Sequence, residues 1–229
     1  YAVGVITPGR LGELMKAGHA TGKKKVLETG FRILIERGLD IGFFVIIAGA
    51  AFMFAYTGMI TDAAGTIILV SGGLIFLLSM VLMKSKSALR RTQKALNSIP
   101  YLKLDMELSF LHISNLTYVS VILLSVISNF SAFISCYMLA LGLDFELSFL
   151  FISGGIAIAG LLNMLPVTVM GLGTREGTFL LLFKPMAEPL IIAFSGLVFL
   201  VAQLGGGLMA LLLGQLFLYN SRRAKRGNS

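Results

Sequence analysis

Charged side chains lie inside runs of apolar residues at three places in the 229-residue sequence. The arginine and acid at these places are Arg10 with Glu13, Arg37 with Asp40, and Arg175 with Glu176. An arginine can bind a phosphate or a carboxylate through two parallel N–H donors. A charge near the centre of a membrane costs roughly 2.5–3.5 kcal/mol, so such residues usually have a function. We therefore predict that these residues form a binding site for a substrate that carries a phosphate.

Breaks in the apolar runs precede two of the arginines. The break before Arg10 is in the segment ITPGRLGELMK, and the break before Arg175 is in MGLGTREGTFL. A helix that starts at a break presents free N–H groups and the positive end of its dipole to an anion. Broken helices at matching positions of two halves are typical of transporter sites, although two such short segments can also match by chance. The residues expected to make the breaks are Pro8, Gly9, Gly12, Pro166, Gly171 and Gly173.

Local ion pairs are the alternative interpretation of these charges. Arg10 and Glu13, and likewise Arg37 and Asp40, are three residues apart and can pair across one helical turn. Arg175 and Glu176 are adjacent, so we expect each to find a partner elsewhere, with Arg175 on the substrate and Glu176 on Arg10 or Arg37. Candidates for hydrogen bonds between helices are Asn129, Ser153, Asn163 and Gln203.

The composition indicates that these sites lie in a membrane protein. Hydrophobic residues make up 56% of the chain and charged residues 13%, against about 25% charged in soluble proteins. The mean hydropathy is +0.89. We predict an all-α, polytopic membrane protein with five or more membrane segments. The apolar runs near the length of a bilayer crossing are Leu39–Ile60, Ala64–Met83, Leu116–Leu141, Leu147–Met170 and Pro189–Leu218.

Few side chains could hold a metal or a cofactor. Cys136 is the only cysteine, and the histidines are His19 and His112. They cannot build a disulfide or a cluster of zinc ligands, and no Walker-type phosphate loop occurs. We expect no metal, no cofactor and no direct use of ATP by this chain.

The basic residues indicate the orientation in the membrane. Of 19 Lys and Arg residues, 7 lie in positions 10–37, 6 in positions 84–103 and 4 in the tail 221–229. By the positive-inside rule these segments face the cytoplasm of a cell membrane, and the acidic connections near Asp62 and Asp144 face outward. Because the bases flank apolar segments and do not line one soluble face, we expect no nucleic-acid partner. The charges from Lys24 onward recur every four residues, which predicts one helix that continues into the run that starts at Leu39.

The orientation requires an odd number of crossings between the outer connection at Asp144 and the tail. We predict that Leu147–Phe183 is a re-entrant hairpin, which enters from outside, breaks at Pro166 and Gly171, and returns. The alternative is a break of Pro189–Leu218 at Gly205–Gly207, which leaves Arg175 in the cytoplasm. Backbone broken at membrane depth must line a polar cavity or be buried in protein. The chain starts at Tyr1 with an apolar segment, and we expect that it lacks N-terminal membrane segments.

Three short segments resemble signatures of a known family. PGRLGELMK, ERGLD at positions 36–40 and GLGTREG at positions 171–177 are similar to those of the lysylphosphatidylglycerol synthase transmembrane domain family. This family includes the flippase half of the multiple peptide resistance factor. The resemblance covers positions 1 to about 220 and implies one transmembrane flippase-like domain, 1–220, followed by a basic tail, 221–229. The sequence shows no soluble aminoacyl-transferase domain, so lysyl transfer is not implied.

The resemblance implies a protein that handles polar lipids. We expect it to bind and translocate polar or anionic lipids across the cytoplasmic membrane, with a phospholipid or lipid-linked substrate. The alternative is a membrane-embedded transferase or an accessory subunit of a lipid-linked glycosyltransferase pathway. An enzyme is less expected, because no nucleophile with a base and no paired acids of a sugar-transfer site stand out. Partners could be a second copy of the chain or a glycosyltransferase or synthase.

Overall fold

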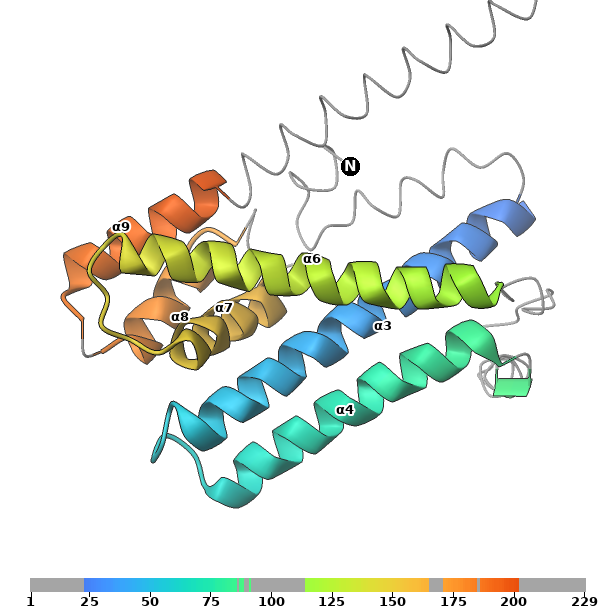
Figure 1. Ribbon diagram of the computed structural model, residues 1–229, viewed down its shortest axis with the longest axis horizontal. Coiled ribbons are helices and arrows are strands. Elements are labelled where there is room, and N and C mark those ends of the chain that lie inside the picture. The colour runs from blue at the N-terminus through green and yellow to red at the C-terminus, as the bar shows by residue number, and fades with distance from the viewer. Residues whose placement is uncertain are drawn as a thin grey trace, which may run out of the picture.

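The computed structural model describes residues 23–85, 87–88, 91, 114–164, 171–184 and 186–201. All regular structure in these residues is helical, which confirms the predicted all-α class. The helices are α3 (Lys23–Phe54), α4 (Asp62–Lys84), α6 (Asn115–Leu141), α7 (Phe149–Asn163), α8 (Thr174–Leu182) and α9 (Glu188–Val198). In Figure 1, α3 and α4 run side by side, α6 crosses over α3, and α7 to α9 gather at the C-terminal end of α6.

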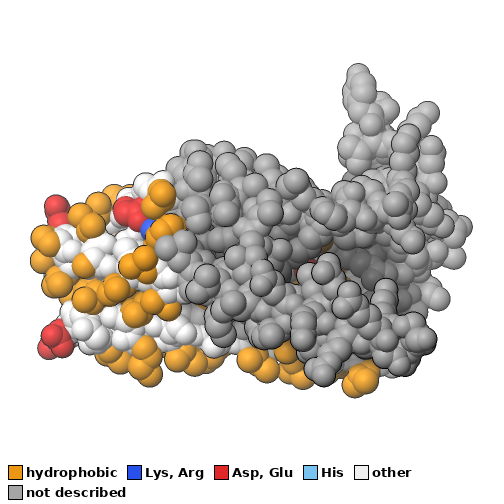
Figure 2. Space-filling view, turned by 90° about the horizontal axis from the view of Figure 1, so that it is seen from above, with side chains coloured by type: hydrophobic (Ala, Val, Ile, Leu, Met, Phe, Trp, Pro, Cys, Tyr) orange, Lys and Arg blue, Asp and Glu red, His pale blue; other side chains and the backbone are white. Residues whose placement is uncertain are grey.

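Two of the described helices, α4 and α6, are long and apolar enough to cross a membrane. They have 23 and 27 residues, with mean hydropathies of 2.5 and 2.0. Their outward faces carry exposed apolar side chains, and Figure 2 shows hydrophobic side chains spread over the described part of the surface. The predicted apolar runs Ala64–Met83 and Leu116–Leu141 agree with these helices within two residues. The expectation of five or more membrane segments stays a prediction.

Helix α3 is one continuous helix of 32 residues, as the spacing of its charges predicted. It packs tightly against the antiparallel α4, because glycines let the two backbones touch. A Cβ added to Gly49 would lie 2.5 Å from the backbone nitrogen of Leu69, and one added to Gly72 would lie 2.6 Å from that of Ile46. A side chain in place of either glycine would therefore force α3 and α4 apart.

Helices α7 and α8 form an antiparallel hairpin. Phe151, near the start of α7, packs against Phe183, just after α8, with ring centroids 5.6 Å apart. At the other end, Thr174 Oγ1 donates a 2.9 Å hydrogen bond to Asn163 Oδ1. The predicted turn between them contains Gly171 at φ +74° and Gly173 at φ +88°, a conformation that glycine adopts at low cost. With 15 residues, α7 is about 22 Å long, which is short for a 30 Å hydrocarbon core.

Helix α9 packs antiparallel to α8 around buried phenylalanine rings. Phe194 of α9 lies 5.4 Å from the ring of Phe179 and 5.9 Å from that of Phe183. All three rings are fully buried. The rings anchor the hairpin, and they leave the first turn of α8 next to the second half of α9. That turn carries Arg175 and Glu176.

Candidate functional site

The carboxylate of Asp40 on α3 accepts hydrogen bonds from two side chains of α6. Ser125 Oγ donates to Asp40 Oδ1 at 3.1 Å, and Asn129 Nδ2 donates to the same oxygen at 2.9 Å. Asn129 was expected to bond between helices, and this contact confirms it. Sequence analysis missed Ser125, although it lies one turn before Asn129 on the same face of α6.

Arg37 pairs with Asp40 across one turn of α3, as the local interpretation predicted. Its Nη1 lies 3.5 Å from Asp40 Oδ2, and the two side chains are 23% and 28% exposed. Ion pairs with this much access to solvent contribute only about 0–1 kcal/mol to stability. The pair therefore contributes little to stability, and its main effect is to place two charged groups at this position on α3.

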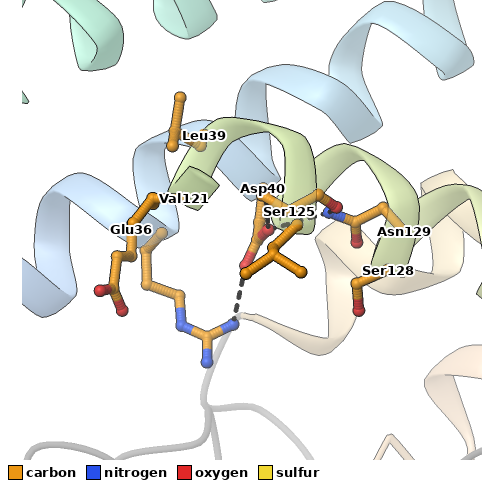
Figure 3. A pocket seen from close by; sticks show the side chains of 9 residues that line it. Glu36, Leu39, Asp40, Val121, Ser125, Ser128 and Asn129 are labelled. Atoms are coloured by element: carbon orange, nitrogen blue, oxygen red, sulfur yellow. Dashed lines mark hydrogen bonds and ion pairs between the residues drawn. The ribbon is translucent and has the colours of Figure 1, made fainter. Parts of the chain in front are cut away.

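A pocket of about 420 Å³ lies beside this pair, between α3 and α6. Figure 3 shows Ser128 and Glu36 on its wall. Nη1 of Arg37 donates to Asp40 Oδ2. Glu36 and Asp40 are acidic and Arg37 is basic, so the described wall carries one negative charge more than positive. Polar and apolar residues both contribute to the wall, which is lined by Glu36, Arg37, Leu39, Asp40, Val121, Leu124, Ser125, Ser128 and Asn129.

The second polar cluster lies between α8 and α9 and centres on Arg175, which is only 3% exposed. Its Nε donates to Ser195 Oγ at 2.8 Å, and its Nη2 donates to Glu176 Oε1 at 2.6 Å. The guanidinium carbon lies 5.2 Å from the centre of the Phe199 ring, which is within the range of a cation–π contact. Sequence analysis did not single out Ser195, a small polar residue in an apolar run.

Glu176 has partners on both carboxylate oxygens. Ser195 Oγ donates to Oε1 at 2.7 Å, and the backbone N–H of Gly173 donates to Oε2 at 2.6 Å. Within the described residues Glu176 pairs with Arg175 and not with Arg37, so the argument that adjacent residues would not pair is wrong. The expected pairing with Arg10 lies outside the described residues. Arg175 and Glu176 both lie in the first turn of α8, where Glu176 folds back to cap the helix start. Its side chain reaches Arg175 from there, and it also fills the place at the helix start that we assigned to a substrate anion.

Helix α7 packs against α3. A Cβ on Gly154 would meet Ala51, and one on Gly160 would lie 2.8 Å from the Phe44 ring, so α7 runs antiparallel to α3. Continuing this register by one turn places Asn163 beside the turn of α3 that contains Asp40. Asn163 binds the first residue of α8. The structure thus brings Arg37 together with Asp40 and Arg175 together with Glu176.

Several predicted residues lie outside the described part of the chain: Pro8, Gly9, Arg10, Gly12, Glu13, Pro166, Gln203, both histidines and the tail 221–229. The alternative break at Gly205–Gly207 lies outside it too. Ser153 is buried, and its hydroxyl has no hydrogen-bond partner within the described residues. The interhelical hydrogen bond predicted for Ser153 is therefore not formed within these residues. Within the same residues, no group of three His, Cys, Asp or Glu side chains could hold a metal ion.

Apolar outward faces around buried polar clusters define an α-helical membrane domain. Such clusters in membrane segments usually bind or pass polar groups. The sequence matches the family model described as "Lysylphosphatidylglycerol synthase TM region" over residues 1–218, so the chain belongs to this family. This confirms the family suggested by the three short segments, and it links the protein to lipid modification in membranes. No curated protein and no solved structure matches the chain.

Proposed function

We propose that the protein binds polar or anionic lipids and translocates them across the cytoplasmic membrane. The pocket beside Asp40 carries this proposal, because it combines two kinds of wall. Asp40, Ser125 and Asn129 offer polar contacts to a headgroup, while Leu124 lines the same pocket and is 64% exposed on the apolar outer face of α6. A lipid needs both environments at once, since its headgroup is polar and its chains are not.

Family membership supports a lipid substrate, and the α7–α8 hairpin supports movement through the membrane. In the proposed arrangement five or more segments lie in the membrane, and the hairpin enters and leaves from the outer side. Its turn then lies at membrane depth, where irregular backbone is tolerated next to polar groups or inside protein. The basic segments 10–37, 84–115 and 221–229 face the cytoplasm, as the positive-inside rule requires.

Cysteine labelling tests this arrangement. The native Cys136 is buried and should give little background. Single cysteines at Lys24, Lys94 and Lys225 should resist a membrane-impermeant maleimide in intact cells, whereas a cysteine at Asp62 should react. If two of the three basic positions were labelled from outside, the predicted orientation in the membrane would be wrong.

A transport assay tests the function itself. Purified protein is reconstituted into liposomes with a fluorescent phospholipid, and a membrane-impermeant quencher follows its appearance in the outer leaflet. Asp40→Asn removes the negative charge that can bind an ammonium group of the headgroup, and it keeps an acceptor oxygen. For a fluorescent phospholipid with an ammonium group in its headgroup, it should slow transport at least about 10-fold, the size expected for a lost charged contact. Asp62→Asn makes the same change at an exposed position outside the pocket and serves as the control. Equal rates for both variants and the unmodified protein would reject the pocket as the headgroup site.

The alternative function, a membrane-embedded transferase or an accessory subunit of a lipid-linked glycosyltransferase pathway, is tested with the same liposomes after a nucleotide-activated or lipid-linked sugar has been added as the group donor. Mass spectrometry of the extracted lipids after transport would detect a covalent product. Transport with unchanged lipid masses supports translocation. A new lipid mass that depends on the protein and on Asp40 supports the transferase instead.

A further inference from the structure

Arg175 has donors that its neighbours leave unused. Nε binds Ser195 and Nη2 binds Glu176, but Nη1 is buried and has no hydrogen-bond partner within the described residues. A guanidinium nitrogen of this kind carries two N–H donors. Buried donors without a partner are rare in folded proteins, and each requires an explanation, because the group has lost its contacts with water.

The cluster holds Arg175 in one orientation. The Ser195 side chain is fully buried, accepts from Arg175 and donates to Glu176, so it fixes the guanidinium relative to both helices. Phe199 lies against the guanidinium. With Nε and Nη2 engaged, Nη1 is the end of the group that remains for a ligand.

Glu176 is held by contacts other than the one with Arg175. Glu176 also accepts from the Gly173 N–H and from Ser195, and it lies in the first turn of α8, where the helix dipole favours a negative charge. These contacts stabilise the carboxylate without help from Arg175. An oxyanion can therefore bind the guanidinium at Nη1 while Glu176 stays ionised and capped.

We propose that Nη1 of Arg175 binds a phosphate group at a site between α8 and α9 that is closed in this structure, with Ser195 as its positioning residue. The site is separate from the Asp40 pocket and does not depend on the transport proposal. Because Nη1 is buried, a ligand can reach it only when α9 moves away from α8. The phosphate can belong to a phospholipid or be free inorganic phosphate, since Arg175 would recognise the same group in both.

A tryptophan in place of Phe199 reports on this site, because the chain contains no tryptophan. The Phe199→Trp protein is purified in dodecyl maltoside, a detergent without phosphate. It is titrated separately with phosphatidylglycerol, with inorganic phosphate and with a galactosyl diacylglycerol that has two chains but no phosphate. We expect a saturable change in tryptophan emission with phosphatidylglycerol and none with the galactolipid.

The response to inorganic phosphate identifies the source. A response to both phosphate compounds shows that the group alone is sufficient, and a response to phosphatidylglycerol alone assigns the site to the lipid. A galactolipid response equal to that of phosphatidylglycerol, or no response to any titrant, overturns the proposal.

Variants on the Phe199→Trp background separate positioning from folding. Ser195→Ala keeps the Arg175–Glu176 pair, so it should fold, and it should raise the half-saturating concentration about 10-fold, the usual effect of losing one good hydrogen bond. Ser195→Thr restores the hydroxyl and should recover most of the affinity. Lys184→Gln removes an exposed charge near the end of α8 and should change nothing. An unchanged titration curve in both Ser195→Ala and Arg175→Lys would reject the site.

The readout is binding in detergent, so it is independent of transport. If the liposomes show no translocation but the tryptophan signal of the Phe199→Trp protein persists, the proposed function fails and the phosphate site stands. If translocation occurs without this signal, the phosphate site fails and the proposed function stands.

Discussion

The Asp40 pocket and the Arg175 cluster contain the same pair of charges in opposite environments. Arg37 and Asp40 are about a quarter exposed and lie beside a pocket of about 420 Å³. The side chain of Arg175 is 4% exposed, and its partners close around it from α8 and α9. The difference shows that an arginine and an acid in an apolar segment do not define one kind of site. The neighbouring helix decides whether the pair faces a pocket or joins two helices.

The carboxylates of Asp40 and Glu176 accept hydrogen bonds from different kinds of donor. Asp40 receives neutral donors from α6, which hold it in place while one side stays open to the pocket. Glu176 receives its contacts from its own helix start and from Ser195, which draws α9 onto α8. We therefore expect substitutions in the Arg175 cluster to change stability more than those in the Asp40 pocket.

The largest expected effect comes from Glu176→Ala. It leaves the guanidinium of Arg175 buried without an anion, and breaking a buried pair costs roughly 3–5 kcal/mol. Because Glu176 is itself 27% exposed, we expect a loss near the lower end, about 3 kcal/mol. Reversible unfolding in mixed micelles measures it. Glu188→Ala removes an exposed acid from the first turn of α9 and, as the control, should cost under about 1 kcal/mol. If Glu176→Ala and Glu188→Ala lost similar unfolding free energies, the Arg175 cluster would contribute no more to stability than an exposed charge.

The second expected effect tests the turn that places Arg175. Gly171→Ala must adopt positive φ, which costs about 1–2 kcal/mol, and its Cβ would also clash with the Asn163 side chain. Gly173→Ala must also adopt positive φ, but a Cβ there meets no atom within 4 Å. Gly171→Ala should therefore be the more destabilising, in the same unfolding measurement. Equal losses would show that the packing of the turn on Asn163 contributes nothing.

The sequence predicted the elements of this comparison better than the contacts between them. Helices α4 and α6 were predicted almost to the residue, because a membrane-length apolar run defines its own limits. The ion pair of Arg37 and Asp40 was predicted as the alternative to a substrate-binding role, since residues three apart share a helix face. The glycine break before α8 was also predictable, because GLG before a polar helix start favours positive φ.

The contacts that distinguish the two clusters come from distant parts of the chain. Ser125 is 85 residues from Asp40, and Ser195 is 20 residues from Arg175. Periodicity within a helix shows which face a serine occupies, but not which helix it meets. The Arg175–Glu176 pair was missed for a local reason, because regular helix geometry separates adjacent side chains. At a helix start the side chain can fold back onto the cap, and this brings the two together.

A smaller effect is expected when Asp40 loses one of its neutral donors. Ser125→Ala leaves the Asn129 contact in place, so the loss of stability should be about 1 kcal/mol. Ser135→Ala is the matched control on the same helix, because its hydroxyl is exposed and bonds only to the Ser131 carbonyl. A loss above about 3 kcal/mol for Ser125→Ala would place the Asp40 pocket in the same class as the Arg175 cluster.

The smallest effect on stability is expected at Ser128. This exposed residue lies on the pocket wall, and its hydroxyl makes no hydrogen bond within the part of the chain that the structure describes. Ser128→Ala should therefore change the unfolding free energy by less than about 0.5 kcal/mol. If the pocket binds headgroups, the same variant should still slow translocation by a few fold, because a hydrogen bond to the ligand is worth about 1 kcal/mol. Ser125→Ala should lower both stability and transport, so the two serines separate a contact that builds the pocket from one that meets the lipid. If Ser128→Ala transported lipids with every tested headgroup at the normal rate, Ser128 would not contact the lipid, and the lipid would not pass along this wall of the pocket.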